Sequence, residues 1–206
     1  SIGDVGVETD QDDFTFPLSM HVTEKLVISD FEVIVDKNID GERKTDNDVK
    51  DGDKINEIAR PGSKVEFEFK LRNQFDSGSD IEIKNIKIEI KSDDIGEDGI
   101  DVELDDEFDI EADEDSNRKT VEFFIPLIVE KETYDVEIHI EGEDKNDKTH
   151  EIDMIVKLEV DKKTHDVIIH EARLLSDTVE CERKTSLIVE LMNIGDTNED
   201  RVKLDV

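Results

Sequence analysis

Residues 64–73 read Lys-Val-Glu-Phe-Glu-Phe-Lys-Leu-Arg-Asn and carry the clearest structural signal in the chain. Val65, Phe67, Phe69 and Leu71 alternate with charged residues throughout this stretch. Side chains of a β-strand point alternately to its two faces, so the pattern predicts a strand with one buried and one solvated face. Strands of this kind are typical of antiparallel sheets that pack on one side only.

The same alternation recurs on both sides of this stretch, and no segment of useful length has a helical period. A polar turn at residues 142–148 separates two such runs and predicts a β-hairpin. The expected inward residues are Val27, Phe31, Val33 and Val35, then Tyr134, Val136, Ile138 and Ile140, then Ile152, Met154, Val156, Leu158 and Val160. A tally of about seven to nine strands predicts an all-β, immunoglobulin-like β-sandwich.

One run of isoleucines changes parity. Ile81 and Ile83 are followed by Ile86 and Ile88, so the apolar spacing slips by one residue near Asn85. A β-bulge inserts one extra residue into a strand and shifts the alternation in this way, so we expect a bulge there.

The composition is strongly acidic. The 206 residues include 59 Asp and Glu against 26 Lys and Arg, a formal net charge of −33. This charge repels phosphate backbones and anionic lipid headgroups, so we expect no nucleic acid and no membrane surface as partner. Adaptation of the source organism to high salt is an alternative explanation for such an acidic composition. Only 34% of residues are hydrophobic, but they fall in regular runs, which favours a folded chain over a disordered one. No stretch approaches the roughly 20 apolar residues that cross a bilayer.

The chain begins at Ser1, without a methionine or a hydrophobic signal segment. This indicates either a processed exported protein or a piece of a longer one, and we expect an extracellular, cell-surface location. Residues 1–23 read as an acidic lead-in or edge strand, because Pro17 restricts a strand there to an edge. The single cysteine, Cys181, is either paired outside this sequence or a small buried residue.

The end of the chain repeats the stretch quoted first. With Asn193 aligned on Asn73, the equivalent pairs are Leu191 and Leu71, Val189 and Phe69, and Leu187 and Phe67. After a loop four residues shorter, Val202, Leu204 and Val206 align with Ile86, Ile88 and Ile90. Two strands in the same order, the first closed by an Asn, indicate a second copy of one domain.

The repeat predicts three parts: a lead-in at residues 1–23, a complete sandwich at 24–161, and the first strands of a second sandwich at 162–206. Half a sandwich leaves an apolar face and an open edge. Three explanations are open. The sequence is a fragment of a longer protein, another molecule supplies the missing strands, or only part of the second sandwich is ordered.

Residues 165–179, 181–186 and 189–195 resemble the cell-adhesion-related (CARDB-like) domains of archaeal S-layer-type and other surface proteins. The shared features are an opening Asp-Val-x-Ile strand at Asp166 and a strand that closes on Asn-x-Gly at Asn193. The resemblance is close over the end of the chain and loose over the central sandwich. It implies tandem immunoglobulin-like modules on exported proteins, used as spacers, adhesins or shell components.

The polar stretch 37–60 is long for a connection inside a compact domain, so we expect it to be either functional or mobile. It holds Asp46, Asp48, Asp51 and Asp53, which we predict as Ca²⁺ ligands, because Ca²⁺ takes about six to eight oxygen ligands. The spacing departs from an EF-hand loop, and a solvated acidic loop is the alternative. A second acidic cluster with the same two explanations consists of Asp93, Asp94, Glu97 and Asp98.

The sequence carries no catalytic signature. The five histidines are dispersed without zinc spacing, and no nucleophile elbow, phosphate-binding glycine loop or Cys–His signature occurs. Acidic pairs are too numerous for any one of them to identify a glycosidase. Trp is absent and Tyr134 is the only tyrosine, so we do not expect a carbohydrate-binding surface. We therefore expect no enzymatic activity.

These observations predict a non-catalytic, extracellular structural or adhesive module of a cell-surface protein, with Ca²⁺ as the candidate stabilising ion. We expect its partners to be proteins, or further copies of itself, bound through strand edges. Two alternatives are open: a subunit of a self-assembling surface filament or shell completed by strand sharing, and an accessory ligand-binding domain of an exported enzyme.

Overall fold

The structure is a computed structural model and describes residues 2–8, 13–19, 24–175 and 185–205, with side chains from residue 24 onward. Every named element in these ranges is a β-strand, and all pairs of named strands are antiparallel. The strands are β1 (Ile2–Glu8), β2 (Asp13–Ser19), β3 (Leu26–Asp36), β4 (Lys44–Asn47), β5 (Lys64–Asn73), β6 (Ile83–Ser92), β7 (Ile100–Glu103), β8 (Phe108–Ile110), β9 (Lys119–Phe124), β10 (Glu132–Asp144), β11 (Thr149–Val160), β12 (Val167–Leu174) and β13 (Leu187–Asn193). The predicted all-β class is confirmed.

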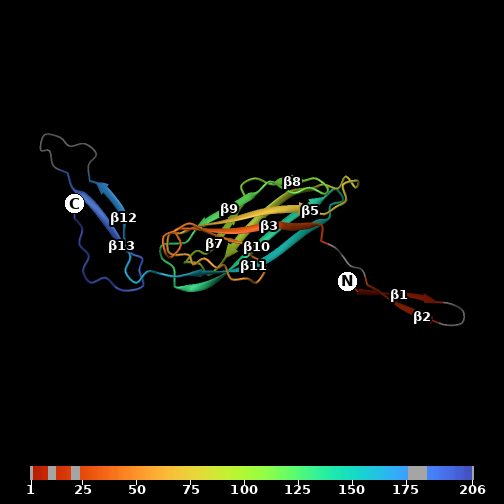
Figure 1. Cartoon of the computed structure of the whole chain (residues 1–206), viewed down its shortest axis with the longest axis horizontal. Coiled ribbons are helices and arrows are strands. Elements are labelled where there is room, and N and C mark those ends of the chain that lie inside the picture. Colours follow the sequence, from red (N-terminus) through yellow and green to blue (C-terminus); the bar gives the residue numbers. More distant parts are fainter. Residues whose placement is uncertain (1, 9–12, 20–23, 176–184, 206) are drawn as a thin grey trace.

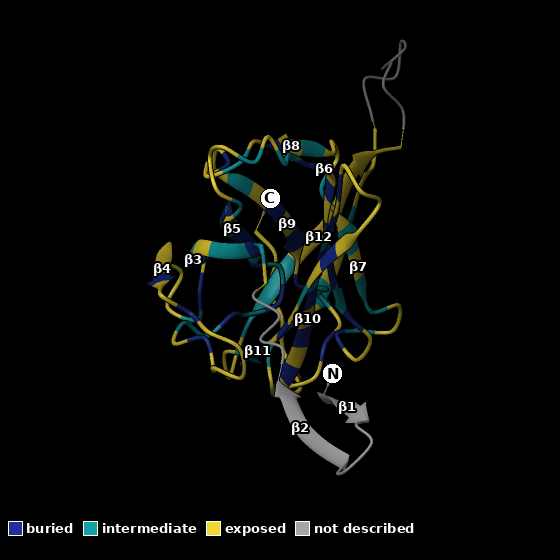
Figure 2. Cartoon of the chain, turned by 90° about the vertical axis from the view of Figure 1, so that its right-hand side faces the viewer, coloured by how far each residue is buried: buried dark blue, intermediate teal, exposed yellow. Residues whose placement is uncertain are grey.

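Two sheets stack face to face to form a β-sandwich (Figure 2). The first sheet has the strand order β4-β3-β5-β9, and the second has β11-β10-β6-β7, with β8 also paired to β6. β5, the strand with the clearest alternation, lies inside the first sheet, where Phe67, Phe69 and Leu71 are fully buried. β10 and β11 form the predicted hairpin on either side of the polar turn.

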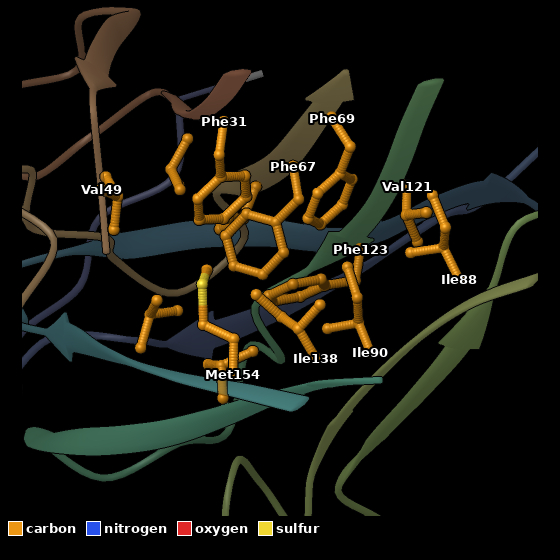
Figure 3. Close-up of a cluster of buried hydrophobic side chains, with 14 of the residues drawn as sticks. Phe31, Val49, Phe67, Phe69, Ile88, Ile90, Val121, Phe123, Ile138 and Met154 are labelled. Carbon is orange, nitrogen blue, oxygen red and sulfur yellow. The ribbon is translucent and has the colours of Figure 1, made fainter. Parts of the chain in front are cut away.

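Phenylalanines of the first sheet fill the centre of the core. Phe31 stacks on Phe69 with ring centroids 4.8 Å apart, and Phe67 meets both Phe31 and Phe123 edge-on at 5.7 Å. Ile138, from the second sheet, reaches the same cluster (Figure 3). Each fully buried side chain of this size contributes roughly 1.5–3 kcal/mol, so the core compensates for the low overall hydrophobicity of the chain.

Two β-bulges set which residues face the core. The predicted bulge is confirmed: the pairing of β6 with β10 shifts register, and Asn85 adopts a left-handed φ of 52°. A second bulge in β3, at Ser29, was not expected. It lets Leu26 turn into the core at 1% exposure, whereas Val27 is only partly buried. The expected inward position of Val27 is therefore wrong.

The polar stretch 37–60 is part of the sandwich wall. It contains β4, and its apolar residues Ile55 and Ala59 are fully buried. The backbone N–H groups of Ile55 and Ala59 donate to the carbonyls of Lys157 and Glu159 in β11, each at 2.9 Å. Because β11 is the edge strand of the second sheet, these bonds cover an edge that would otherwise be open to pairing with another chain.

A two-stranded hairpin lies at each end of the sandwich (Figure 1). β1 pairs only with β2, and β12 pairs only with β13, among the described strands. The lead-in therefore forms a hairpin, and its Pro17 lies opposite Asp4.

Candidate functional site

The C-terminal hairpin β12–β13 repeats the geometry of β3–β5. The pairs that flank the bulge are Ile28–Leu71 and Asp30–Lys70 in β3–β5, and Ile169–Leu191 and Glu171–Glu190 in β12–β13. The closing asparagines also match, because Asn73 lies opposite Leu26 and Asn193 lies opposite Val167. The two strand pairs thus share both their register and the position of their bulge, over every residue pair from the asparagine to the bulge.

The two asparagines make the same turn. Each side-chain carbonyl accepts a hydrogen bond at 3.0 Å from the backbone N–H two residues later. The Asn73 amide donates to the carbonyl of Ile81, and the Asn193 amide donates to that of Thr197, the equivalent position after a loop four residues shorter. Asn73 also donates to Ile110 in β8 and is fully buried, whereas Asn193 is exposed. In the described residues, Asn193 therefore has the local turn without the surrounding sandwich.

The face of β12–β13 that corresponds to the buried face of β3–β5 is exposed. Its apolar residues Ile169, Leu174, Leu187 and Leu191 are 56%, 50%, 45% and 38% exposed. The equivalent residues Val33, Phe67 and Leu71 of the sandwich are fully buried, and Ile28 is partly buried. Contiguous apolar surface of this kind marks interaction sites, so we take these four residues, named here the C-terminal apolar face, as the candidate functional site.

The strand predicted at Val202 and Leu204 is not formed. Residues 201–205 have no ladder partner, both side chains are more than 40% exposed, and Val206 lies outside the described residues. In the sandwich the equivalent strand, β6, pairs with β10, and no described strand occupies that position beside residues 201–205. A strand at residues 201–205 would therefore lack the neighbour that β10 provides for β6.

The four aspartates predicted to bind Ca²⁺ lie on one short segment, but three of them have other partners. Asp46 accepts hydrogen bonds from the backbone and side-chain amides of Asn56, Asp51 from the N–H of Ile155, and Asp53 from the N–H of Lys50. Asp48 has a left-handed φ of 59°. Across the described ranges, no three His, Cys, Asp or Glu side chains are arranged to hold a metal ion. Ca²⁺ binding by Asp46, Asp48, Asp51 and Asp53 stays a prediction.

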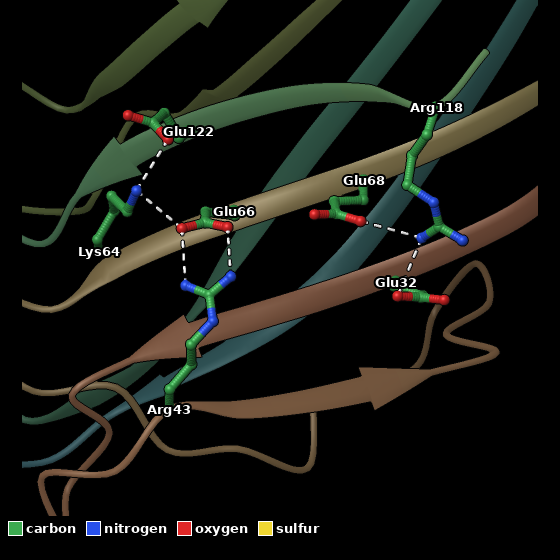
Figure 4. Close-up of polar contacts among 7 residues, drawn as sticks. All are labelled: Glu32, Arg43, Lys64, Glu66, Glu68, Arg118 and Glu122. Carbon is green, nitrogen blue, oxygen red and sulfur yellow. Dashed lines mark hydrogen bonds and ion pairs between the residues drawn. The ribbon is translucent and has the colours of Figure 1, made fainter.

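A buried carboxylate anchors the same stretch to the outer face of the first sheet (Figure 4). Arg43 binds Glu66 through two hydrogen bonds of 3.0 and 2.9 Å, and Lys64 contacts Glu66 at 2.8 Å and Glu122 at 3.1 Å. The bonds from Arg43, supported by Lys64, lower the pKa of Glu66 to about 2, although burial acts in the opposite direction. Nearby, Arg118 bridges acidic residues of β3 and β5. These ion pairs link neighbouring strands of the first sheet.

Three histidines in the described residues, His139, His150 and His165, lie beside carboxylates. His150 Nε2 lies 3.2 Å from buried Asp144, and His165 Nδ1 lies 2.7 Å from Glu199. The Thr197 hydroxyl is 3.1 Å from the same Nδ1 of His165. A nucleophile triad needs the hydroxyl and the carboxylate on different ring nitrogens, so this arrangement is not one.

Two further candidates from the sequence are the second acidic cluster and the cysteine. Asp93, Asp94, Glu97 and Asp98 are all exposed on the turn between β6 and β7. Cys181 lies outside the described residues. No helix in the described part of the chain is long and apolar enough to cross a membrane.

No protein-family model matches the chain, and no curated protein matches it. The likeness to CARDB-like domains therefore stays a prediction from the residues quoted above.

Proposed function

We propose that this chain is a non-catalytic structural or adhesive module of an exported, cell-surface protein, built from consecutive immunoglobulin-like sandwiches of the CARDB-like kind. The observation that carries the proposal is the register shared by β3–β5 and β12–β13, with its bulge at the same place. A unit that recurs along one chain builds a rod, because each unit contacts only its neighbours.

The surface of the sandwich supports a role as an exposed spacer. Its outer strand faces carry charged side chains, many in lateral pairs such as Arg43–Glu66, while a net charge of −33 favours solubility. The 51–59 segment covers the edge of β11, which limits unspecific pairing of the sandwich with other chains. The C-terminal apolar face supplies an apolar surface for a specific contact.

Surface labelling tests the proposal. An antibody raised against residues 24–161 is applied to intact cells of the source organism, with lysed cells as the control for total protein. We expect intact and lysed cells to label equally. Labelling that appears only after lysis would overturn the surface role.

A further inference from the structure

We propose that the β1–β2 hairpin of a second copy of this chain covers the C-terminal apolar face, so that chains join head to tail. This deepens the proposed function, on which it rests for the structural role of the chain, by naming the partner of that face.

The two terminal hairpins are complementary halves of one sandwich. β12–β13 has the register of β3–β5, a pair of neighbouring strands of the first sheet. β11 ends at Val160, seven positions before β12 begins at Val167. β2 ends at Ser19, also seven positions before β3 begins at Leu26. β1–β2 therefore precedes β3–β5 along the chain as β10–β11 precedes β12–β13, and β10–β11 is a hairpin of the second sheet.

In the complete sandwich, a second-sheet hairpin is what covers the face in question. Ile138 of β10 and Val156 of β11 are buried in the same core as Phe67 and Leu71 of β5. On β12–β13 the positions equivalent to Phe67 and Leu71 are Leu187 and Leu191, which have no such cover in the described residues. A β1–β2 hairpin from another copy would supply it.

The backbone pairing of the sandwich also gives the arriving hairpin an edge to join. β6 pairs with β10, with Ile88 opposite Ile140. The repeat assigns the position of β6 to the stretch that contains Val202 and Leu204, so β1 of the second copy would pair there as β10 does. Such addition of a strand to an exposed edge recurs in peptide recognition.

The sequence of the hairpin suits this role. Its register sets Val5 opposite Phe16 and Val7 opposite Phe14, so apolar residues are paired with apolar residues. β1–β2 pairs with no other described strand, and it lies at the end of the sandwich opposite to β12–β13 (Figure 1). A donor at one end and an acceptor at the other produce an open chain of copies instead of a closed symmetric pair.

Charge sets the conditions of the test. Every copy carries a net charge of −33, so copies repel each other at low ionic strength, and salt screens this repulsion. We expect sedimentation velocity of the whole chain to show dimers and longer species that increase with protein concentration and with added NaCl.

Two variants separate donor from acceptor. Leu191→Asp places a charge on the C-terminal apolar face, and Phe16→Asp does so on the hairpin. We expect each to weaken self-association at least about tenfold, and an equimolar mixture to form a heterodimer and nothing longer, because one intact donor and one intact acceptor remain. Ile155→Asp is the matched control: Ile155 is apolar and 43% exposed, lies on the sandwich, and should leave association unchanged. Circular dichroism verifies that each variant keeps its strands.

Three outcomes would overturn the inference. A wild-type chain that stays monomeric up to high concentration and high salt would mean that other strands cover the face. If Phe16→Asp associates as the wild type does and Leu191→Asp does not associate, two C-terminal apolar faces pair directly with each other. A mixture of the two variants that stays monomeric would exclude donor and acceptor roles. Surface labelling is independent of all three, so a failure here leaves the proposed function intact, and failed labelling leaves the association intact.

Discussion

Replacing Glu66 by Gln should reveal how much the ion pairs of Glu66, on the outer face of the first sheet, contribute to the free energy of folding. The Glu66 side chain is 8% exposed, and Arg43 and Lys64 lower its pKa from 4.5 to about 2. A difference of one pKa unit between the folded and unfolded states corresponds to about 1.4 kcal/mol. The difference of about 2.5 units for Glu66 therefore corresponds to roughly 3 kcal/mol of folding free energy. Because the pKa of the folded state is the lower one, this stabilisation is complete above pH 4.5 and is lost as the pH falls toward 2.

The measurement is urea unfolding of the wild type and Glu66→Gln between pH about 7 and about 3. At neutral pH we expect the variant to unfold with up to about 3 kcal/mol less free energy, and the gap to narrow below pH 4.5. The other acidic residues titrate in both proteins and cancel in the difference. Glu122→Gln is the control: its side chain is 51% exposed, so we expect a loss below about 1 kcal/mol. A gap that does not change with pH would refute the assignment of the stabilisation to the Glu66 charge.

Three further predictions concern the Asn73 turn, the acidic stretch and a glycine of β10. Asn73→Ala removes three hydrogen bonds at a buried site, so we expect it to lower the free energy of unfolding by about 2–4 kcal/mol. The exposed Asn193→Ala should lower it by less than about 1 kcal/mol. Equal losses for the two variants in urea unfolding would contradict this comparison. For the predicted Ca²⁺ site, we expect saturating Ca²⁺ to raise the melting temperature of the wild type by several degrees, and that of Asp48→Asn by less. A wild-type melting curve that does not change with Ca²⁺ would exclude the site. Gly142→Ala would bring a Cβ to 2.8 Å from two buried isoleucine side chains of β6, so we expect the free energy of unfolding to fall by about 1–3 kcal/mol. A melting temperature equal to that of the wild type would refute the predicted clash.

Strand identity was predictable wherever one face was consistently apolar. β5 and the β10–β11 hairpin alternate without interruption, and the bulge at Asn85 is visible because the isoleucines on its two sides differ in parity. The bulge at Ser29 is hidden, because Leu26, Val27 and Ile28 are apolar in succession and fit either parity.

The role of residues 37–60 was not predictable, because it depends on backbone hydrogen bonds between segments about 100 positions apart in the sequence. The buried apolar residues of this stretch, Val49, Ile55 and Ala59, are too few and too irregularly spaced to signal a strand. Likewise, the acidic residues at 46–53 suggest a cation, whereas the geometry assigns three of the carboxylates to N–H groups.

The apolar face of β12–β13 follows from the sequence repeat, since the alignment of Asn193 with Asn73 already pairs the correct positions. The alignment did not anticipate that the bulge also recurs, at His170 as at Ser29, because neither strand shows it as a change of parity. The hairpin formed by β1 and β2 was missed, because residues 1–8 lack a clear alternation.

The hydrogen bonds between β11 and residues 51–59 have a mechanical consequence. The chain enters the sandwich at β3 and leaves it at β11, at opposite ends, so tension on the chain runs along the strands (Figure 1). The bonds of β11 to β10 run across the strands, and tension therefore shears many of them at once instead of opening them one after another. The bonds from the 51–59 segment add resistance on the other side of β11. A module built in this way resists extension by its backbone pairing, whatever binds at its ends.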